Sequence, residues 1–292
     1  MTHEEQAVLV AWLRRPRVVW STVTERLEDC GSVRAAAAEE EPAQGSLFET
    51  TRDDGLDQAA SDLDRWKRDG IWMVSVLDPG YPSNLRMIHQ HPPVLFMRGT
   101  ADERDDMSVA VVGTRHPTER GIEQAGQLAA GLAASGIPVI SGLAAGIDSA
   151  AHTAALAACG RTVAVIGTGI DRAYPPQNAK LQEEIAAKGL LVSQFLPGSP
   201  PTKASFPMRN AVMSGYTLAT VVVEAADRSG SRMQARLALQ HGRHVFLLRS
   251  LLEQDWARDY EQRPGVTVVE TAADVLAGLQ RLASESTDLI WA

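Results

Sequence analysis

From Ile71 onward, short apolar runs alternate with longer Ala-rich runs, and this alternation constrains the fold more than any other feature of the sequence. The apolar runs predict strands at Ile71–Leu77, Val94–Arg98, Ser108–Val112, Pro138–Ile140, Thr162–Ile166, Leu190–Ser193, Leu218–Val223, His244–Leu248 and Val266–Val268. The Ala-rich runs predict helices at Thr118–Ser135, Ala145–Cys159, Gln177–Lys188, Met208–Ser214, Ser231–Gln240 and Thr271–Leu282. Strands that are apolar throughout and are separated by helices are typical of a parallel sheet covered on both faces. We therefore predict an α/β fold with a doubly wound, mostly parallel sheet, whose ligands bind beyond the carboxyl ends of the strands.

The residues before this region are predicted to be helical, with one irregular stretch. Helices are expected at 3–15, Ser21–Cys30 (with Ser21 as N-cap), Ser32–Glu40 and Leu56–Asp69, and a linker or disordered loop at Glu39–Gly55. The chain then divides into a small helical domain (1–40), an acidic linker and helix (41–70), the sheet domain (71–283) and a short frayed tail (284–292).

The net charge of −8 argues against a protein that is basic over its whole surface. The acidity is concentrated, however. Residues 25–64 hold 12 acidic and 3 basic residues, so the remaining 24 acidic and 25 basic residues nearly cancel. A local basic groove is therefore compatible with the composition.

The sequence gives no sign of a metal site, a disulfide or a membrane segment. Cys30 and Cys159 lie far apart and have no second ligand at metal-binding spacing, which fits a reducing compartment. The weakly polar run Leu128–Ile147 contains Pro138 and several glycines, so we interpret it as helix, turn and strand rather than a membrane span. We expect a cytoplasmic protein without a signal peptide.

Two turns after predicted strands have the composition of phosphate-binding sites. Gly113-Thr114-Arg115 follows the third strand, and a glycine, a hydroxyl and an arginine there form a cradle with a charged clamp. Ser141-Gly142 opens a Gly-rich turn that leads into a helix, whose free N–H groups attract anions. Asp148 and His152 share a face of that helix at i, i+4. They suit either an acid–base pair or a structural pair, and we favour the structural one.

Two further stretches extend this pattern. Lys203, Phe206, Arg209 and Asn210 combine two cations, an aromatic ring and an amide, a composition suited to stacking a base and meeting phosphates. Ser229 and Gly230 open another helix and can form an anion nest.

A dinucleotide cofactor is not expected. Gly167-Thr168-Gly169 begins like a dinucleotide-binding turn, but Arg172 replaces the third glycine, and no P-loop motif occurs. We predict no cofactor at all.

In this order, the turns resemble the DNA-processing protein A (DprA, also called Smf) family. The resemblance runs from Tyr81 to about Leu282 and is most specific in the Ser141–His152 stretch, Ser-Gly-Leu-Ala-x-Gly-Ile-Asp followed by Ala-His. It implies a Rossmann-like domain that binds single-stranded DNA without strong sequence preference and passes it to the recombinase RecA. It also implies a homodimer.

Carried over by motif, the resemblance gives the binding residues roles. Gly113, Thr114, Arg115 and Lys203 would hold phosphates, Phe206 would stack a base and Asn210 would hydrogen-bond the strand; Ser141 and Gly142 would line the same edge. The chain departs from the family pattern at Ala211, where a third basic residue is usual, and at Gln194, where Glu is usual.

Two other functions remain open from the residues. A nucleotide-processing hydrolase, such as a phosphoribohydrolase, would use Glu224 or Asp148 beside a glycosidic bond, although the Pro-Gly-Gly-x-Gly-Thr turn of those enzymes is absent. A protein that senses a small nucleotide without chemistry is the other alternative. We expect no enzymatic activity, since no group of residues forms a convincing catalytic site.

Overall fold

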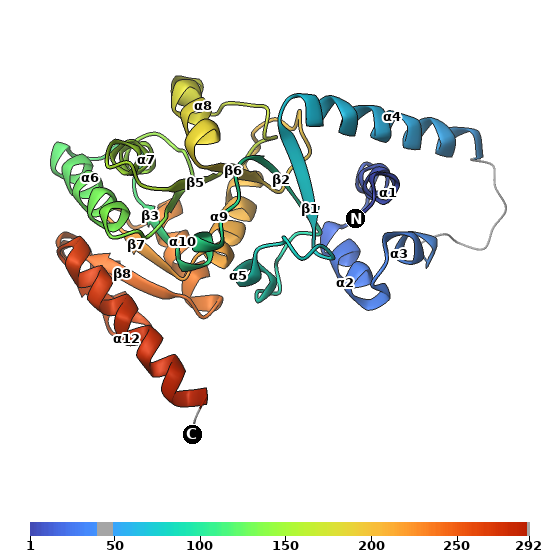
Figure 1. Ribbon diagram of the computed structural model, residues 1–292. Coiled ribbons are helices and arrows are strands. Elements are labelled where there is room, and N and C mark those ends of the chain that lie inside the picture. The colour runs from blue at the N-terminus through green and yellow to red at the C-terminus, as the bar shows by residue number, and fades with distance from the viewer. Residues whose placement is uncertain (40–48, 291–292) are drawn as a thin grey trace.

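The computed structural model describes residues 1–39 and 49–290, and it contains all nine predicted strands (Figure 1). Their ends differ from the predicted ones by at most two residues. The strands are β1 (Ile71–Ser75), β2 (Val94–Gly99), β3 (Val109–Val112), β4 (Val139–Ser141), β5 (Thr162–Val165), β6 (Leu190–Ser193), β7 (Ala219–Val222), β8 (His244–Leu248) and β9 (Val266–Val269).

In the described part of the chain these strands form one sheet in the order β1-β2-β6-β5-β4-β3-β7-β8-β9. Strands β3 to β9 pair in parallel wherever they are neighbours. Strand β2 is antiparallel to both β1 and β6, which extends one edge of the sheet. From β3 the chain adds β4, β5 and β6 on one side, and then returns to place β7 on the other. The switch point of this doubly wound sheet therefore lies between β3 and β7, where such folds bind their ligands.

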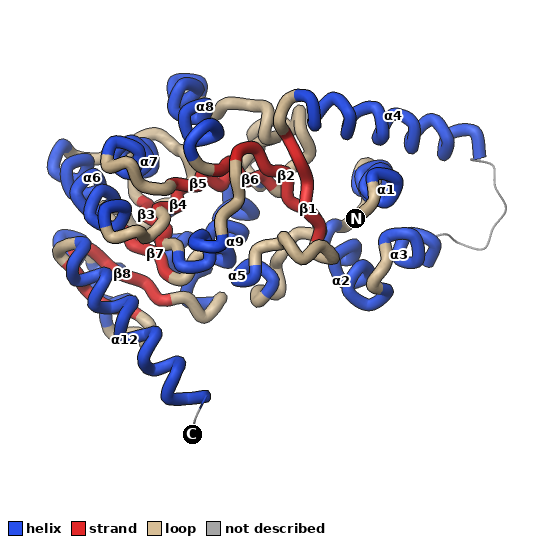
Figure 2. Tube along the Cα trace, in the orientation of Figure 1, coloured by secondary structure: helices blue, strands red, loops and turns tan. Residues whose placement is uncertain are grey.

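Helices cover both faces of the sheet (Figure 2). The longer ones are α6 (Glu119–Ala134), α7 (Ile147–Ala157), α8 (Ala179–Lys188), α9 (Ser205–Tyr216), α10 (Gly230–Gln240) and α12 (Ala272–Ile290). Helix α6 packs against α7 and α12, whereas α9 packs against α10. The sequence did not predict α5 (Ser83–Arg86), α11 (Asp255–Glu261) or the 3₁₀ helices η1 (Glu103–Met107), η2 (Pro176–Asn178) and η3 (Arg249–Glu253), because they are too short to show a period.

The start of α7 was predicted two residues too early. Gly146 precedes the helix with φ of +85°, a conformation that side chains rarely adopt, and a Cβ there would lie 2.5 Å from the carbonyl oxygen of Thr114. The chain can therefore enter the helix only after Gly146. The same close approach packs the turn after β4 against the turn after β3.

Four helices precede the sheet: α1 (His3–Leu13), α2 (Trp20–Cys30), α3 (Val33–Glu39) and α4 (Glu49–Arg68). Ser21 is not the N-cap of α2, since Val19 occupies that position and the partly buried Trp20 already begins the helix. Residues 49–55 belong to α4 rather than to a linker, and residues 40–48 lie outside the described part of the chain.

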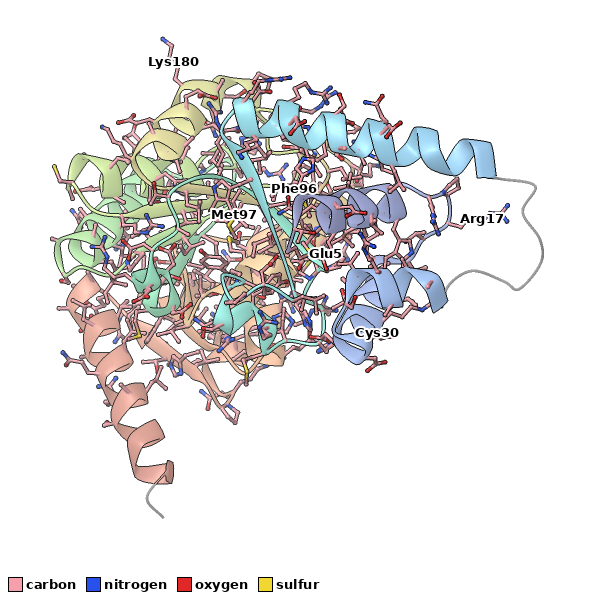
Figure 3. All side chains as sticks on the ribbon, turned by 45° about the vertical axis from the view of Figure 1, so that its right-hand side comes forward. Glu5, Arg17, Cys30, Phe96, Met97 and Lys180 are labelled. Carbon is pink, nitrogen blue, oxygen red and sulfur yellow. The ribbon has the colours of Figure 1, made fainter. Side chains whose placement is uncertain are left out.

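The hydrophobic core is continuous between these helices and the sheet. The Trp66 ring of α4 meets the Phe96 ring of β2 edge-on, with centroids 5.4 Å apart. Phe96 and Met97 are both fully buried and lie in the interior in Figure 3. The proposed boundaries at 40, 70 and 283 stay predictions, because no break in the core marks them.

The predicted short tail lies partly within a helix, over residues 284–290. Helix α12 continues through them to Ile290, since Val275, Leu276 and Leu279 anchor it on the core and no proline or glycine follows Gly278. Within the described residues, no helix is both long and apolar enough to cross a membrane.

Candidate nucleic-acid interface

Two cavities lie along the carboxyl ends of the central strands. One, of about 170 Å³, is lined by the turns after β4 and β5. The other, of about 270 Å³, is lined by the turns after β3 and β7, at the switch point of the sheet. Five residues line both: Arg115, His116, Ala144, Phe206 and Arg209. Because they share these walls, the two cavities form one groove, which we call the edge groove.

The turn after β3 places a free positive charge in the edge groove. The backbone N–H of Thr114 donates to the Glu224 carbonyl at 2.7 Å, which ties this turn to the one after β7. Arg115 is exposed and forms no ion pair with any described residue. Its guanidinium carbon lies 5.1 Å from the centre of the Phe206 ring, so the charge is held by a cation–π contact rather than by a carboxylate.

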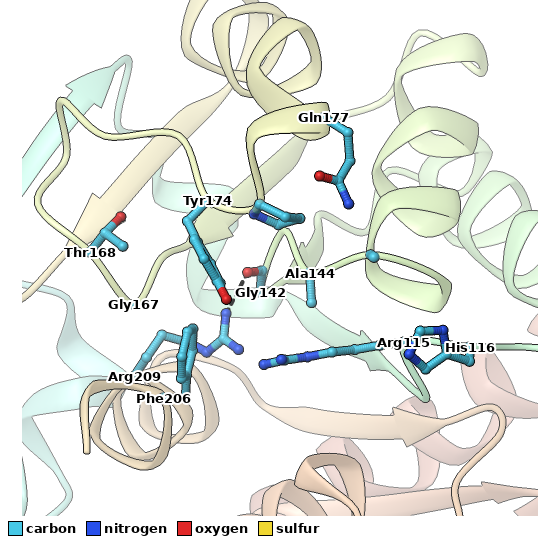
Figure 4. Close-up of a pocket in the computed structure, with 12 residues that line it drawn as sticks. Arg115, His116, Gly142, Ala144, Gly167, Thr168, Tyr174, Gln177, Phe206 and Arg209 are labelled. Carbon is cyan, nitrogen blue, oxygen red and sulfur yellow. Dashed lines mark hydrogen bonds between the residues drawn. The ribbon is translucent and has the colours of Figure 1, made fainter. Parts of the chain in front are cut away.

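Two aromatic rings stand at the smaller cavity. Phe206, in the first turn of α9, is half-buried, and Tyr174 is 40% exposed. Their ring centres are 5.6 Å apart, with an angle of 39° between the planes. Figure 4 shows both rings on the cavity wall, with the Arg115 side chain extending towards them. The rings therefore offer apolar faces next to a cation, which suits a base beside a phosphate.

Arg209 does not extend into solvent as a phosphate clamp would. Its guanidinium is buried under the groove and donates to the Gly142 carbonyl, to the Val165 carbonyl at 3.0 Å and to the Asn210 amide oxygen at 2.9 Å. Burial lowers its pKa, and the nearby charge of Asp148 opposes that shift. Arg209 therefore joins α9 to the ends of β4 and β5 from beneath the groove.

Asn210 is also engaged within the protein. Its amide oxygen accepts from Arg209, and its amide nitrogen donates to the Gly230 carbonyl at 3.3 Å. The side chain is 6% exposed. These two bonds hold the amide within the protein, but Asn210 also lines the larger cavity, so its hydrogen bond to a DNA strand stays a prediction.

The structural pairing of Asp148 with His152 was predicted wrongly, because each side chain is bound elsewhere. Asp148 accepts from the backbone N–H groups of Gly142 at 3.1 Å and Ala144 at 3.3 Å, so it does stiffen the turn after β4. His152 Nδ1 lies 2.7 Å from the Thr162 hydroxyl, which itself donates to a backbone carbonyl. The imidazole Nδ1–H is therefore the donor to Thr162.

Burial also shifts the pKa of both groups. It raises the pKa of Asp148, and it lowers the pKa of His152 to about 3, with the Arg209 charge acting in the same direction on the histidine. His152 is thus neutral at physiological pH and bonded to Thr162 rather than to Asp148, so these two residues do not form an acid–base pair.

Ser141 does not line the groove, contrary to the sequence prediction. It is fully buried at the end of β4, and its hydroxyl donates to the Val111 carbonyl at 2.7 Å. Strands of a parallel sheet are buried on both faces, so a serine at this position satisfies a neighbouring carbonyl instead of reaching a ligand. Gly142, the next residue, does line the groove.

The remaining predicted residues lie at the groove or near it. Gly113, Thr114, Ser229 and Gly230 line the larger cavity. The Ser229 hydroxyl caps α10 by accepting from the Arg232 N–H at 3.1 Å, and a side chain at Gly230 would meet open space. Lys203 is exposed in the loop before α9 and has no polar partner within the described residues. Ser229 and Gly230 thus bring the N-terminus of α10 to the groove, whereas Lys203 lines neither cavity and lies in the chain just before Phe206.

The Glu224 carboxylate accepts hydrogen bonds from within the protein. Both carboxylate oxygens lie 3.2 Å from the Thr118 N–H, and one accepts from the Thr118 hydroxyl at 2.8 Å. Thr118 is the N-cap of α6, so Glu224 holds the entry to that helix. A carboxylate used in this way is a poor candidate for a general base, and Asp148 beneath the groove is the one acid that lines either cavity among the described residues.

The sequence prediction missed several groove residues, among them Tyr174, Gln177 and His116. Tyr174 and Gln177 come from the loop between β5 and α8, and His116 follows Arg115. The Tyr174-Pro175 motif was visible, but a loop residue can be placed in a cavity only when the path of the loop is known. The groove is basic, although the whole chain has a net charge of −8.

The fold and the groove define a Rossmann-like α/β protein with its candidate binding site at the switch point of the sheet. More specifically, the chain belongs to the DNA recombination-mediator protein A family, whose family model matches residues 72–285. This match confirms the resemblance seen in the sequence.

Relatives by sequence and by structure agree with this assignment. Protein Smf of Synechocystis is 44% identical over 175 residues, which cover 59% of this chain and 44% of that protein. DNA processing protein DprA of Streptococcus pneumoniae is 40% identical over 206 residues, which cover 70% of this chain and 72% of that protein. The chain thus spans less than half of the Synechocystis relative.

Two solved structures share the fold over most of their length. The crystal structure of DprA from Streptococcus pneumoniae superposes with a TM-score of 0.74 and 31% identity, over 95% of this chain and 98% of that one. The other shows the single-stranded DNA binding mode of DNA processing protein A from Helicobacter pylori. It superposes with a TM-score of 0.65 and 26% identity, over 72% of this chain and 96% of that one.

Proposed function

We propose that this chain binds single-stranded DNA along the edge groove. The observation that carries the proposal is the Arg115–Phe206 contact at the switch point, where an unpaired cation and an aromatic face lie side by side. Single-strand binding proteins combine these two elements, since the cation meets a phosphate and the ring stacks a base. The Helicobacter relative, described by its single-stranded DNA binding mode, supports the same ligand.

The proposed phosphate path follows the turns at the groove and continues to the loop before α9. Its members are Gly113, Thr114, Arg115, Gly142, Lys203, Ser229 and Gly230. Arg209, Asp148 and Asn210 support this path from beneath, because their polar atoms already bond to the chain. Phe206 stacks one base.

We further propose that the protein is not an enzyme. The two carboxylates with a potential catalytic role, Glu224 and Asp148, accept hydrogen bonds from the protein itself. Protection of single-stranded DNA, its delivery to RecA, the homodimer and a cytoplasmic location are part of the same proposal. They rest on membership of the family.

Fluorescence anisotropy with a labelled oligonucleotide tests the central proposal. We expect the protein to bind a single strand with an affinity whose logarithm falls linearly with the logarithm of the salt concentration. Binding to the matched duplex should be weaker. Arg115→Ala and Lys203→Ala should each weaken binding, whereas Lys180→Ala, an exposed side chain pointing away from the protein on α8 (Figure 3), should not. Binding that is absent, or that ignores Arg115 and Lys203, would contradict the proposal.

A further inference from the structure

The outer edge of β1 presents main-chain groups that β2 does not use. Among the described residues, β1 is an end strand of the sheet and pairs with β2 alone, in antiparallel register. The Val76 N–H donates to the Pro93 carbonyl at 3.0 Å, and in an antiparallel pair such bonds recur at every second residue. The N–H and C=O groups of Ile71, Met73 and Ser75 therefore point away from β2.

Of these three positions, only Ser75 is closed by the described part of the chain. Its N–H donates to the Asp78 carboxylate at 2.8 Å, and its carbonyl accepts from the Asp78 N–H at 2.9 Å. By contrast, no group within residues 1–39 and 49–290 hydrogen-bonds the outward N–H or C=O of Ile71 or Met73. These two residues thus offer donors and acceptors at the spacing of an extended main chain.

The side chains of β1 do not protect this open edge. Proteins usually block an edge strand with charged residues, proline or a bulge, because an open edge pairs with another extended chain. The β1 sequence, Ile-Trp-Met-Val-Ser, has no charged residue and no proline, and its register with β2 contains no bulge. The edge is therefore suited to receiving a further strand.

A cavity of about 280 Å³ opens at the same two residues. It lies between β1, α1 and α4, and Figure 1 shows both helices beside this end of the sheet. A cavity of roughly 150 Å³ already admits benzene, so this one has room for a bulky apolar side chain. Its apolar walls are Leu63, Trp66, Ile71, Trp72, Met73 and Phe96.

The polar rim of the cavity is positively charged. Lys67 is exposed there and forms no ion pair with any described residue, and His3 and Gln6 complete the rim. His3 Nε2 lies 3.2 Å from the Asp64 carboxylate, but no carboxylate of the described residues lines the cavity itself. The rim therefore favours a negatively charged group next to the apolar side chain.

We propose that β1 is a docking edge for an extended, acidic segment of another protein. The segment pairs with the main chain of Ile71 and Met73, places a bulky apolar side chain in the cavity and brings a carboxylate to Lys67. In this mode of recognition the main-chain bonds supply affinity, and the cavity supplies specificity. The site belongs to the end of the sheet rather than to its switch point, so the inference goes beyond DNA binding and does not rest on it.

Amide hydrogen exchange followed by NMR tests whether the edge is open. In the free protein the N–H groups of Ile71 and Met73 should exchange at least about tenfold faster than those of Trp72 and Val74, which bond to β2. Equal protection of all four would refute the open edge. Protection of Ile71 and Met73 that falls on dilution would show that a second copy of the chain covers the edge, which also contradicts the proposal.

The probe for docking is the capped peptide Glu-Thr-Thr-Phe-Thr-Thr-Glu, with Leu, Trp and Ala versions at its centre. We expect the apolar versions to slow exchange at Ile71 and Met73, and the Ala version to bind about tenfold more weakly, since it leaves the cavity unfilled. N-methylation of the even-numbered or of the odd-numbered peptide amides should weaken binding about tenfold in one set only, because successive amides of a strand face opposite edges. If no peptide slows exchange at about 1 mM, the docking edge is refuted.

A matched pair of charge reversals tests the rim. A version of the peptide with Lys in place of both Glu residues should bind the parent chain about two- to fivefold more weakly. Lys67→Glu should reverse this preference. Arg68→Glu, which makes the same kind of change at the next exposed residue of α4 but away from the cavity, should largely keep it. An equal effect of the two variants would remove Lys67 from the site.

Competition with DNA separates this inference from the proposed function. A saturating single-stranded oligonucleotide should leave the affinity for the Phe peptide unchanged, and displacement of the peptide would place it in the edge groove and contradict the proposal. If the oligonucleotide does not bind, the proposed function fails, whereas the exchange and peptide results at β1 still decide this inference.

Discussion

Replacement of Arg209 should destabilise the fold and change its dependence on pH. Arg209 is 6% exposed and donates to the Gly142 and Val165 carbonyls. In Arg209→Met these carbonyls lose their donor, at about 1–3 kcal/mol for each buried group left unpaired. Asp148, which is fully buried and sensitive to the Arg209 charge, also loses its nearby cation. Loss of one partner from a buried charge network costs about 3–5 kcal/mol, and we expect the variant to lose an amount in that range at pH 7.

The pH dependence follows from the pKa of Asp148. Burial raises this pKa above the ordinary value of 3.8, and loss of the Arg209 charge raises it further. A raised pKa means that the folded state holds the proton more tightly than the unfolded state. The group therefore contributes stability that is fully present below pH 3.8 and is lost as pH rises through the folded pKa. Arg209→Met should thus lose more stability than the parent chain between about pH 4 and pH 7.

Urea unfolding followed by circular dichroism at several pH values measures both effects. The control is the double variant Arg209→Met/Asp148→Asn, in which asparagine keeps an acceptor for the Gly142 and Ala144 N–H groups but cannot ionise. This variant should regain part of the lost free energy of unfolding at pH 7 and lose the added pH dependence. A loss below about 1 kcal/mol, or no recovery in the double variant, would refute the assigned network.

Three further predictions concern the groove and the turn after β7 beside it. Arg115→Ala should weaken single-strand binding and reduce the slope of log affinity against log salt by about 0.7, as expected for one phosphate contact. Salt titrations measure this slope, and Arg120→Ala, which removes an exposed arginine on α6, is the control. An unchanged slope would exclude Arg115 from the phosphate path. Phe206→Ala should cost about 1–3 kcal/mol of binding in the same assay, whereas Phe206→Tyr keeps the stacking face and should bind normally. Glu224→Ala should lower the free energy of unfolding by about 1 kcal/mol, because the Thr118 cap of α6 loses the carboxylate that holds it. Chromatography should detect no base released from nucleoside monophosphates by this variant or by the parent chain.

The strands were predictable because a central parallel strand is buried on both faces, and its sequence is then apolar throughout. Strands such as β5 and β8 are buried in this way, and their ends are marked by polar residues or glycine. The first half of α4 was missed for the opposite reason. It is highly charged and contains Gly55, a composition that also fits a linker.

The site was predictable as a set of turns but not as a set of side-chain directions. The motifs pointed to Arg115 and Phe206, and both residues line the groove. Arg209 and Asn210 were expected to face the ligand, yet most of α9 is buried and these two side chains point into the protein. A helix that is buried over most of its surface shows no polar stripe in its sequence, so the sequence does not indicate which face meets the ligand.

The contact between the turns after β3 and β4 has a consequence for the speed of binding. The Ile147 N–H donates to the Thr114 carbonyl at 3.2 Å, and Gly146 packs against the same residue, so the two turns are locked together. The backbone at Thr114 and Arg115 thus acquires its shape when the protein folds, and a ligand has little to reorganise on arrival. An encounter with a strand in the right orientation should then lead directly to the bound state, and association should approach the rate set by diffusion and charge.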